Sequence, residues 1–332
     1  MKVQVETPSR LHFTLIDLHG GLGRVDGGVG VALETPGWKI TVEPASEGLQ
    51  VEGCPYAEAS EVRELALKFF KQYPARQPLK IKVSQGVPRH VGLGSRTQLA
   101  LGVAASLASF LQVEAPVRFL AQLMGRGGTS GIGVAAFEAG GVIVDGGHTF
   151  GPKGQKQSFL PSRFSKAPPP PVLARYYPPE DWFWVVAVPP KVKGAHGFRE
   201  AEIFQKSCPL PRGEVEKVSR IVLMKLMPGL AEADIEAVGE ALNLIQKVGF
   251  KKIEVRLAGR LPSRLMKLFL DQGAYGSGLS SFGPAVYALA SGRKQAENLR
   301  KAALEFFEEK NVEGTVFKAR TSRRGARIRR ET

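Results

Sequence analysis

The feature that most constrains the fold is a glycine-rich stretch, GVPRHVGLGSRTQ at residues 86–98, which lies between two regular elements. The segment before it, LKIKVS, alternates apolar and polar residues and predicts a strand, whereas TQLALGVAASLASFL after it predicts an apolar helix. Ser95 and Gln98 have the spacing of a capping box. Gly92 and Gly94 allow a tight turn whose exposed backbone N–H groups, together with the helix dipole, form a binding site for an anion.

A glycine turn without a ligand explains the same residues equally well. The stretch has no lysine of the Walker kind, and Arg96 stands where a small hydroxyl residue would fit. A helix terminus contributes only about 0.3–1 kcal/mol per charge, and up to about 2 kcal/mol when it is partly buried. A bound pyrophosphate therefore needs further cations, from arginines or from a metal ion.

The composition is that of an ordinary globular protein of two modest domains, with 332 residues, 43% of them hydrophobic and 23% charged. No apolar run approaches the roughly 18 residues of a membrane-spanning helix. The first residues, MKVQVETPSR, lack the apolar core of a signal peptide. The two cysteines lie far apart without metal-ligand neighbours, so neither a disulfide framework nor a zinc site is indicated. We therefore expect a cytoplasmic protein with no membrane partner.

The net charge of +15 is the unusual global property. The last fifteen residues, KARTSRRGARIRRET, hold seven Lys or Arg against one acid. We expect this stretch to be a frayed, solvated tail, so that removing residues 319–332 leaves catalysis nearly unchanged. An RNA-binding arm is the alternative function for it. Because the rest of the chain is also basic, a polyanionic small substrate suits the charge at least as well, and we do not expect nucleic acid as a partner.

Strands and helices alternate irregularly along the chain. KVQVE, RLHFTLI, WKITVE and LKIKVS alternate in polarity and predict strands. Apolar periodicity predicts helices at 60–73, 97–111, 116–125, 214–227, 231–247, 262–271 and 293–309.

A proline-rich segment, APPPP at residues 167–171, followed by Pro178 and Pro179, cannot continue a helix or a strand. We expect it to be a linker or a long surface connection, and we place the domain boundary there. The predicted parts are an N-terminal domain at 1–166, a connection at 167–181, a C-terminal domain at 182–318 and a basic tail at 319–332.

Three segments together resemble the motifs of the GHMP superfamily, the small-molecule kinases of galactose, homoserine, mevalonate and phosphomevalonate. PSRLHFTLIDLHGGLGRVDGGVGVALETP, residues 8–36, resembles the first motif, and VGLGSRTQLALG resembles the second. YGSGLSSFGPAVYALA, residues 275–290, resembles the third. The resemblance covers nearly the whole chain. It implies a two-domain α+β fold, with an N-terminal ribosomal-protein-like domain, a C-terminal ferredoxin-like domain and a substrate cleft between them.

Two departures separate the chain from those kinases. Their loop usually ends in two serines, the second of which helps to hold magnesium, and Arg96 stands at that position here. They also tend to carry an aspartate beside the attacking hydroxyl. In the matching segment, GTSGIGVAAFEAGG, that position is Gly133. The departures weigh against phosphorylation of an alcohol, although an ATP-dependent small-molecule kinase stays the alternative function.

The same segments resemble a non-kinase branch, the beta-ribofuranosylaminobenzene 5'-phosphate synthase (beta-RFAP synthase) family of archaeal methanopterin biosynthesis. The matching stretches are GLGSRTQLALG, GRGGTSGIGVAAFEAGGVIVDGGH and SSFGPAVYAL. The resemblance implies a magnesium-dependent enzyme that joins phosphoribosyl pyrophosphate to 4-aminobenzoate or 4-hydroxybenzoate and releases pyrophosphate and carbon dioxide. Two positions depart from it, Leu279 and Phe282, where we expect Gln and Trp. The choice of benzoate and the oligomeric state, including a homodimer, stay open.

Within this hypothesis each site residue has a predicted role. The pyrophosphate group is assigned to the loop, that is, to Gly92, Leu93, Gly94, Ser95, Arg96, Thr97 and Gln98, with Arg96 also catalytic. The ribosyl centre becomes oxocarbenium-like and needs a carboxylate, for which Asp17 and Asp26 are the candidates. Asp26 is equally a candidate Mg²⁺ ligand, and Glu138 is a second one.

The remaining substrate-binding candidates also have plain structural explanations. Arg10, His12 and Arg24 suit the 5'-phosphate or the benzoate carboxylate, or only strand-edge polarity. Arg126 and Ser130 precede a glycine turn that a helix C-cap explains equally well. Asp145 and His148 follow an apolar strand, where a plain turn is the alternative. Ser280 and Ser281 predict a second anion-facing turn.

Overall fold

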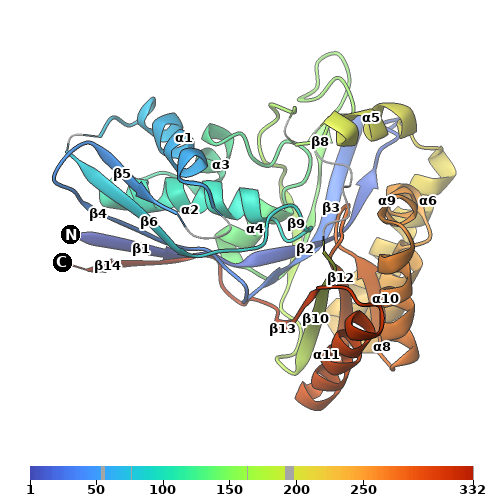
Figure 1. Cartoon of the computed structure of the whole chain (residues 1–332). Helices are drawn as coiled ribbons and strands as arrows, with labels where there is room; N and C mark the ends of the chain where they lie inside the picture. The colour runs from blue at the N-terminus through green and yellow to red at the C-terminus, as the bar shows by residue number, and fades with distance from the viewer. Residues whose placement is uncertain (54–56, 76, 163, 191–197, 332) are drawn as a thin grey trace.

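The protein folds into three β-sheets flanked by helices, as seen in a computed structural model that describes residues 1–53, 57–75, 77–162, 164–190 and 198–331 (Figure 1). The predicted α+β fold is confirmed. Cys54 lies outside the described residues. Within the described residues, none of the helices combines the length and the apolar character needed to cross a membrane.

The first sheet belongs to the N-terminal lobe. Its strand order is β14 (Arg327–Glu331), β1 (Lys2–Glu6), β4 (Lys39–Pro44), β6 (Leu79–Gln85) and β5 (Leu49–Glu52). Neighbouring strands are antiparallel except β5 and β6. The long apolar helix α2 (Ser95–Phe110) packs on β1 and β4, and it is flanked by α1 (Ala59–Phe70) and α3 (Val117–Leu123).

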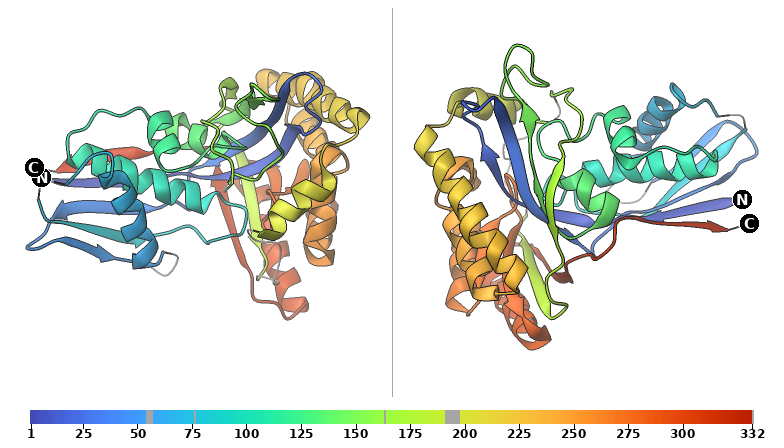
Figure 2. Two further views of the ribbon diagram at one scale, coloured as in Figure 1. Left: turned by 90° about the horizontal axis from the view of Figure 1, so that it is seen from above. Right: turned by 180° about the vertical axis from the view of Figure 1, so that it is seen from behind.

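The second sheet places the site. Its order is β2 (Ser9–Asp17), β3 (Arg24–Leu33), β7 (Val142–Asp145) and β9 (Val172–Tyr176), and β8 (His148–Thr149) pairs with the first residues of β3. Helix α4 (Ile132–Ala139) covers it. The strands β2 and β3 extend toward the helices of the C-terminal lobe (Figures 1 and 2).

The C-terminal lobe is ferredoxin-like, as the resemblance implied. Its antiparallel sheet has the order β11 (Gly276–Leu279), β12 (Val286–Ser291), β10 (Trp182–Val188) and β13 (Thr315–Arg320), which is that of a split βαβ fold. Helix α11 (Gly292–Glu309) connects β12 to β13. Between β10 and β11 lie α5 (Phe198–Ser207), α6 (Arg212–Ile221), the π-helix η1 (Val222–Leu226), α7 (Met227–Glu232), α8 (Ile235–Ile245), α9 (Gly249–Ala258) and α10 (Arg260–Asp271).

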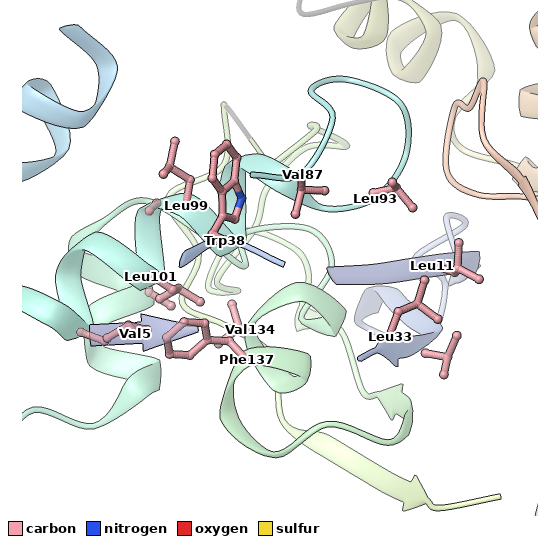
Figure 3. Packing of buried hydrophobic residues seen from close by; sticks show 14 of the residues in the cluster. Val5, Leu11, Leu33, Trp38, Val87, Leu93, Leu99, Leu101, Val134 and Phe137 are labelled. Carbon is pink, nitrogen blue, oxygen red and sulfur yellow. The ribbon is translucent and has the colours of Figure 1, made fainter. Parts of the chain in front are cut away.

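One apolar core joins the two lobes. Figure 3 shows part of it, with labelled side chains from β1, α2 and α4 packed together, and the Trp38 indole N–H donates to the backbone carbonyl of Ser95 at 2.9 Å. Phe13 on β2 packs against Trp184 and Tyr287 of the C-terminal sheet, with ring centroids 5.4 and 5.2 Å apart. The aromatic contacts therefore fix β2, and the site residues on it, against the C-terminal lobe.

Two sequence-based expectations about the connections are wrong in part. The predicted helix at 214–227 ends as an α-helix at Ile221 and continues as a π-helix. The predicted linker contains β9, which pairs with β7, and its prolines are held by Arg118, whose guanidinium donates to the Pro170 carbonyl at 2.8 Å. Proline excludes regular structure only at 167–171, and β9 pairs with the N-terminal lobe while Asp181 accepts hydrogen bonds from Ser291 and Gly292 of the C-terminal lobe.

The C-terminal stretch is not a frayed tail. β14 pairs along the whole of β1, with Val3 opposite Arg330 and Val5 opposite Ile328, and the two termini lie side by side (Figures 1 and 2). Thr321, just before it, accepts a hydrogen bond from the Trp184 indole at 3.0 Å. The arginines remain exposed while their backbone completes the edge of β1. Removing residues 319–332 therefore also removes structural contacts of both lobes.

A chain that ends at Ala326 would lose β14 alone. We expect its melting temperature to fall by several degrees, because each net hydrogen bond of the β1–β14 ladder is worth roughly 0.5–1.5 kcal/mol. The exposed edge of β1 should also favour self-association. Thermal unfolding and light scattering measure both effects. Turnover well below the melting temperature should stay near that of the full chain, and an unchanged melting temperature would contradict the structural role of β14.

Candidate active site

The glycine stretch forms a tight loop that depends on two glycines in the left-handed region, Gly92 with φ +96° and Gly94 with φ +73°. A Cβ at Gly92 would lie 2.3 Å from the Ser280 carbonyl oxygen, so only glycine fits at this position. The predicted capping box is wrong. Gly94 is the N-cap of α2 with no side-chain cap, and the Gln98 side chain instead donates to the Gly133 carbonyl at 2.7 Å.

A cleft of about 250 Å³ opens at this loop. Residues of both lobes line it, and they include the loop from Gly92 to Thr97, Arg10 and His12 of β2, Arg126 and Ser130, Glu200 of α5, Glu254 of α9, and Ser281 and Phe282. The cleft therefore gathers residues from all three sequence motifs and from two helices outside them.

Hydrogen bonds hold the three motifs together. The Ser280 hydroxyl donates to the Gly92 carbonyl at 2.7 Å and accepts from the His12 backbone N–H at 3.0 Å. The Ser281 backbone N–H donates to the His12 carbonyl at 3.0 Å. Ser280 is fully buried and lies behind the cleft surface, whereas Ser281 lies on it. The contact of Ser280 with Gly92 fixes the position of the glycine loop relative to β2.

Two basic groups of β2 flank the loop. The Arg10 guanidinium donates to the Gly92 carbonyl, and burial lowers the pKa of Arg10 to about 10, an effect that Glu254 and Glu200 oppose. Burial also lowers the pKa of His12 well below its ordinary value, and the nearby Arg10 and Lys251 add to this. His12 Nε2 lies 3.1 Å from the Ser130 hydroxyl. At neutral pH the cleft therefore holds a charged Arg10 and an uncharged imidazole.

The cleft also contains a pair of acids, of which Glu254 is buried and Glu200 is half-buried. Burial raises the pKa of Glu200 to about 7, and the neighbouring Glu254 adds to this, while Arg96 and Arg10 oppose it. Burial raises the pKa of Glu254, which is opposed by an ion pair with Lys251. Lys251 is itself fully buried and donates to the Leu279 and Ser281 carbonyls at 3.1 and 3.3 Å. These contacts connect α9 to the third motif.

This pair of acids suits a magnesium ion that arrives with a phosphorylated substrate. The described residues contain no group of three or more His, Cys, Asp or Glu side chains that could hold a metal. Mg²⁺ usually takes only one or two carboxylates together with substrate phosphates and water. The negative charge of Glu254 adds to the raised pKa of Glu200, and a divalent cation bound by both carboxylates would offset this repulsion. Glu200 and Glu254 line the cleft, whereas the predicted ligands Asp26 and Glu138 are not among the described residues that line it.

Asp26 is held in a buried structural triad. Its carboxylate accepts from Lys156 Nζ at 2.8 and 3.0 Å and lies 2.7 Å from His148 Nδ1. His148 Nε2 lies 2.9 Å from the Pro168 carbonyl. Asp26 and His148 are fully buried and are not among the described residues that line the cleft. The surroundings of Asp26 therefore do not support the predicted catalytic and metal-binding roles, and His148 anchors the connection.

The other predicted residues outside the cleft have similar structural contacts. Asp17 accepts from the backbone N–H groups of His19 and Gly20, and Arg24 donates to the Gly147 carbonyl at 3.1 Å. Asp145 accepts from the N–H groups of Gly131 and Gly147, and burial raises its pKa to about 7. Glu138 is exposed near the end of α4, about 9 Å along the helix axis from its first residue, Ile132. None of these contacts supports a direct role in the site.

The sequence is similar to known proteins in both lobes. Residues 60–141 match the model of the GHMP kinases N terminal domain, and residues 226–309 match that of the GHMP kinases C terminal domain. Over 292 residues, 86% of the chain, it is 47% identical to the beta-ribofuranosylphenol 5'-phosphate synthase of Methanothermobacter thermautotrophicus, of which 88% is covered. It is 42% identical to the enzyme of that name from Archaeoglobus fulgidus over 98% of the chain and 99% of that protein. The chain belongs to the beta-ribofuranosylphenol 5'-phosphate synthase family.

The fold of this synthase family member is also that of the kinases. A homoserine kinase from Cytophaga hutchinsonii superposes with a TM-score of 0.69 and 16% identity, over 98% of this chain and 97% of that chain. At the position where the resemblance places the kinase aspartate, Gly133 packs against α2. A Cβ there would lie 3.1 Å from the Thr97 side chain, so a carboxylate would fit only after Thr97 moves.

The sequence patterns did not indicate that Glu200, Lys251 and Glu254 lie at or beside the cleft. Lys251 and Glu254 lie in FKKIEVRL, which has the pattern of a charged, solvent-exposed helix face, yet both are buried. Glu200 lies in a helix that was not predicted. These residues come together only in the folded chain, and local periodicity does not reveal that proximity.

Proposed function

We propose that this enzyme transfers the phosphoribosyl group of phosphoribosyl pyrophosphate to a 4-substituted benzoate, with release of pyrophosphate and carbon dioxide, in methanopterin biosynthesis. The observation that carries the proposal is the combination of a glycine loop flanked by Arg10 and Arg96 with a glycine at position 133. Such a site binds phosphate and lacks the carboxylate for activating an alcohol. The names of the relatives contain "ribofuranosylphenol", which favours 4-hydroxybenzoate over 4-aminobenzoate.

The loop and its arginines are suited to the leaving group. Departure of pyrophosphate from ribose C1 develops negative charge on the bridging oxygen, and preorganised cations stabilise that charge. Arg96 lies on the first turn of α2, and its Nε is buried without a hydrogen-bond partner in the described part of the chain. A pyrophosphate oxygen would supply that partner. Arg96 is therefore the proposed clamp.

Glu200 and Glu254 are the proposed magnesium ligands. When bound, the ion would neutralise charge on the pyrophosphate. Arg10, which donates to the Gly92 carbonyl, would then share the phosphate charge at the loop. Lys251 holds Glu254 in place through their ion pair, so its role is to position a ligand. These two glutamates replace Asp17 and Asp26 as the carboxylates closest to the proposed ribosyl centre.

The aromatic acceptor is proposed to lie against Phe204, Phe282 and Leu15, which form the apolar part of the cleft. The ring carbon that bears the carboxylate forms a bond to C1 as the bond from C1 to pyrophosphate breaks. Loss of carbon dioxide then returns the electron pair of the broken carbon–carbon bond to the ring. Because no ring proton is removed, the step needs no general base, in agreement with the glycine at position 133.

Pyrophosphate release from phosphoribosyl pyrophosphate tests this function. With magnesium present, release should depend on 4-hydroxybenzoate or 4-aminobenzoate, because the para lone pair feeds electron density to the attacking carbon. Unsubstituted benzoate is the matched control and should give a far slower rate. ATP should be neither required nor consumed. Phosphorylation of an alcohol by ATP, without pyrophosphate release, would instead establish the kinase function.

Glu200→Gln tests the proposed magnesium ligand and its titration. The folded pKa of about 7 lies above the ordinary 4.5, so the folded state binds the extra proton and wild-type stability falls as pH rises from about 4.5 to 7. That loss amounts to roughly 1–3 kcal/mol, and the variant should lack it in denaturant titrations. The variant should also need more magnesium for half-maximal rate. Glu202→Gln, an exposed neighbour on α5, is the control, and equal behaviour of the two variants would contradict the role of Glu200.

A further inference from the structure

A second cavity of about 510 Å³, here termed the basic pocket, adjoins the active-site cleft. Its cationic lining residues are Lys68 from α1, Arg96 from α2, Arg126 after α3, and Lys166 before the proline-rich segment. Arg96 and Arg126 also line the cleft, so the two cavities meet at these side chains. The proposed reaction uses none of the lysines.

Positive side chains predominate in the lining of the basic pocket. None of the described residues that line it is Asp or Glu. Lys68 Nζ lies 3.3 Å from the place that a Cβ would take on Gly125, a glycine with φ +67° at the end of α3, so the ammonium group reaches over this turn. Burial together with the positive charges of Arg126 and Lys71 lowers the pKa of Lys68. Clustered positive charges raise the local concentration of anions.

Arg96 connects this charge to the chemistry. Its buried Nε has no hydrogen-bond partner within the described residues, and its side chain borders both cavities. A planar guanidinium can donate to two phosphoryl oxygens at once, whereas each lysine contributes a point charge. An anion that leaves the glycine loop past Arg96 therefore meets two further cations, Lys68 and Lys166, in the basic pocket.

We propose that the basic pocket is a binding site for inorganic pyrophosphate, which it receives as the product leaves the cleft. The assignment of the anion rests on the proposed function, since that reaction produces pyrophosphate at the glycine loop. The site separates the product from ribose C1 while Arg96 contacts both cavities. It is distinct from the substrate site, so its loss should weaken pyrophosphate binding more than it weakens binding of phosphoribosyl pyrophosphate.

The test is calorimetric titration of inorganic pyrophosphate into the full-length protein and a Lys68→Glu/Lys166→Glu variant. Both lysines are exposed, so the variant should fold, and thermal unfolding verifies this. We expect Kd for pyrophosphate to rise about tenfold or more, because the loss of one charge-assisted hydrogen bond weakens binding by about that factor. The KM for phosphoribosyl pyrophosphate should change less than threefold. Lys294→Glu/Lys301→Glu on α11 is the control, because it makes the same change of net charge at exposed positions of the other lobe.

The outcomes separate this inference from the proposed function. A pyrophosphate Kd equal to that of the control variant would overturn the basic pocket as a product site, even if the proposed reaction proceeds. A weakened Kd in a protein that does not turn over phosphoribosyl pyrophosphate would support the pocket and contradict the reaction. The smaller change Lys68→Ala, with the charge removed rather than reversed, should shift Kd in the same direction.

Discussion

Arg96→Ala is expected to lower kcat/KM for phosphoribosyl pyrophosphate about ten- to hundredfold. Removing a charge-assisted hydrogen bond to the leaving group costs roughly 1.5–3 kcal/mol, and about 1.4 kcal/mol in the barrier corresponds to tenfold in rate. The Arg96 Nε is buried and has no hydrogen-bond partner among the residues that the structure describes, which indicates a group held ready for an anion. Steady-state rates of pyrophosphate release measure the effect.

Arg293→Ala is the matched control, because this arginine is exposed on α11 and its loss makes the same change of net charge. Arg96→Ser, which restores the residue of the kinases, should not produce ATP-dependent activity while position 133 is glycine. Wild-type efficiency of Arg96→Ala would remove this residue from the mechanism.

Lys156→Met is expected to lower the free energy of unfolding by roughly 3–5 kcal/mol, because it leaves the carboxylate of Asp26 buried without its ammonium partner. Lys156 is itself buried and also reaches the Thr129 hydroxyl and the Leu160 carbonyl, at 3.4 and 3.3 Å. Its loss therefore affects the segment before the proline-rich connection as well as β3. Denaturant titration gives the change in free energy.

Two further variants make this result specific. Lys267→Met breaks an exposed ion pair with Asp271 and should cost less than about 1 kcal/mol. Asp26→Asn combined with Lys156→Met should recover part of the lost stability, because the unpaired buried charge is gone. A Lys156→Met protein as stable as Lys267→Met would contradict the structural role of the triad and would make Asp26 available again as a catalytic carboxylate.

The local features of the site could be predicted from the sequence. The strand, glycine turn and helix around residues 86–98 follow from periodicity and from the conformational freedom of Gly92 and Gly94, and the structure has them in that order. The roles within the turn could not be predicted as well. Gln98 has the spacing of a cap, but the Gly133 carbonyl, which it contacts, lies 35 residues later in the chain.

The acids show why the rest of the site could not be predicted. Asp26 in a glycine-rich motif resembles a catalytic carboxylate, and only the contact with Lys156, 130 residues away, shows that it is structural. Glu254 in a charged helix resembles a surface residue, and only the packing of α9 against β2 and the third motif buries it in the cleft. Burial of a charge depends on tertiary contacts, which neither composition nor spacing specifies.

The most direct test of the proposed reaction uses 4-hydroxybenzoate labelled at the carboxyl carbon, with phosphoribosyl pyrophosphate, magnesium and no ATP. One attack by the carboxyl-bearing ring carbon releases both products, so labelled carbon dioxide and pyrophosphate should appear in equal amounts and at equal rates. Pyrophosphate without labelled carbon dioxide would mean that water or the para oxygen attacks C1 instead. That result would contradict decarboxylative carbon–carbon bond formation at this site.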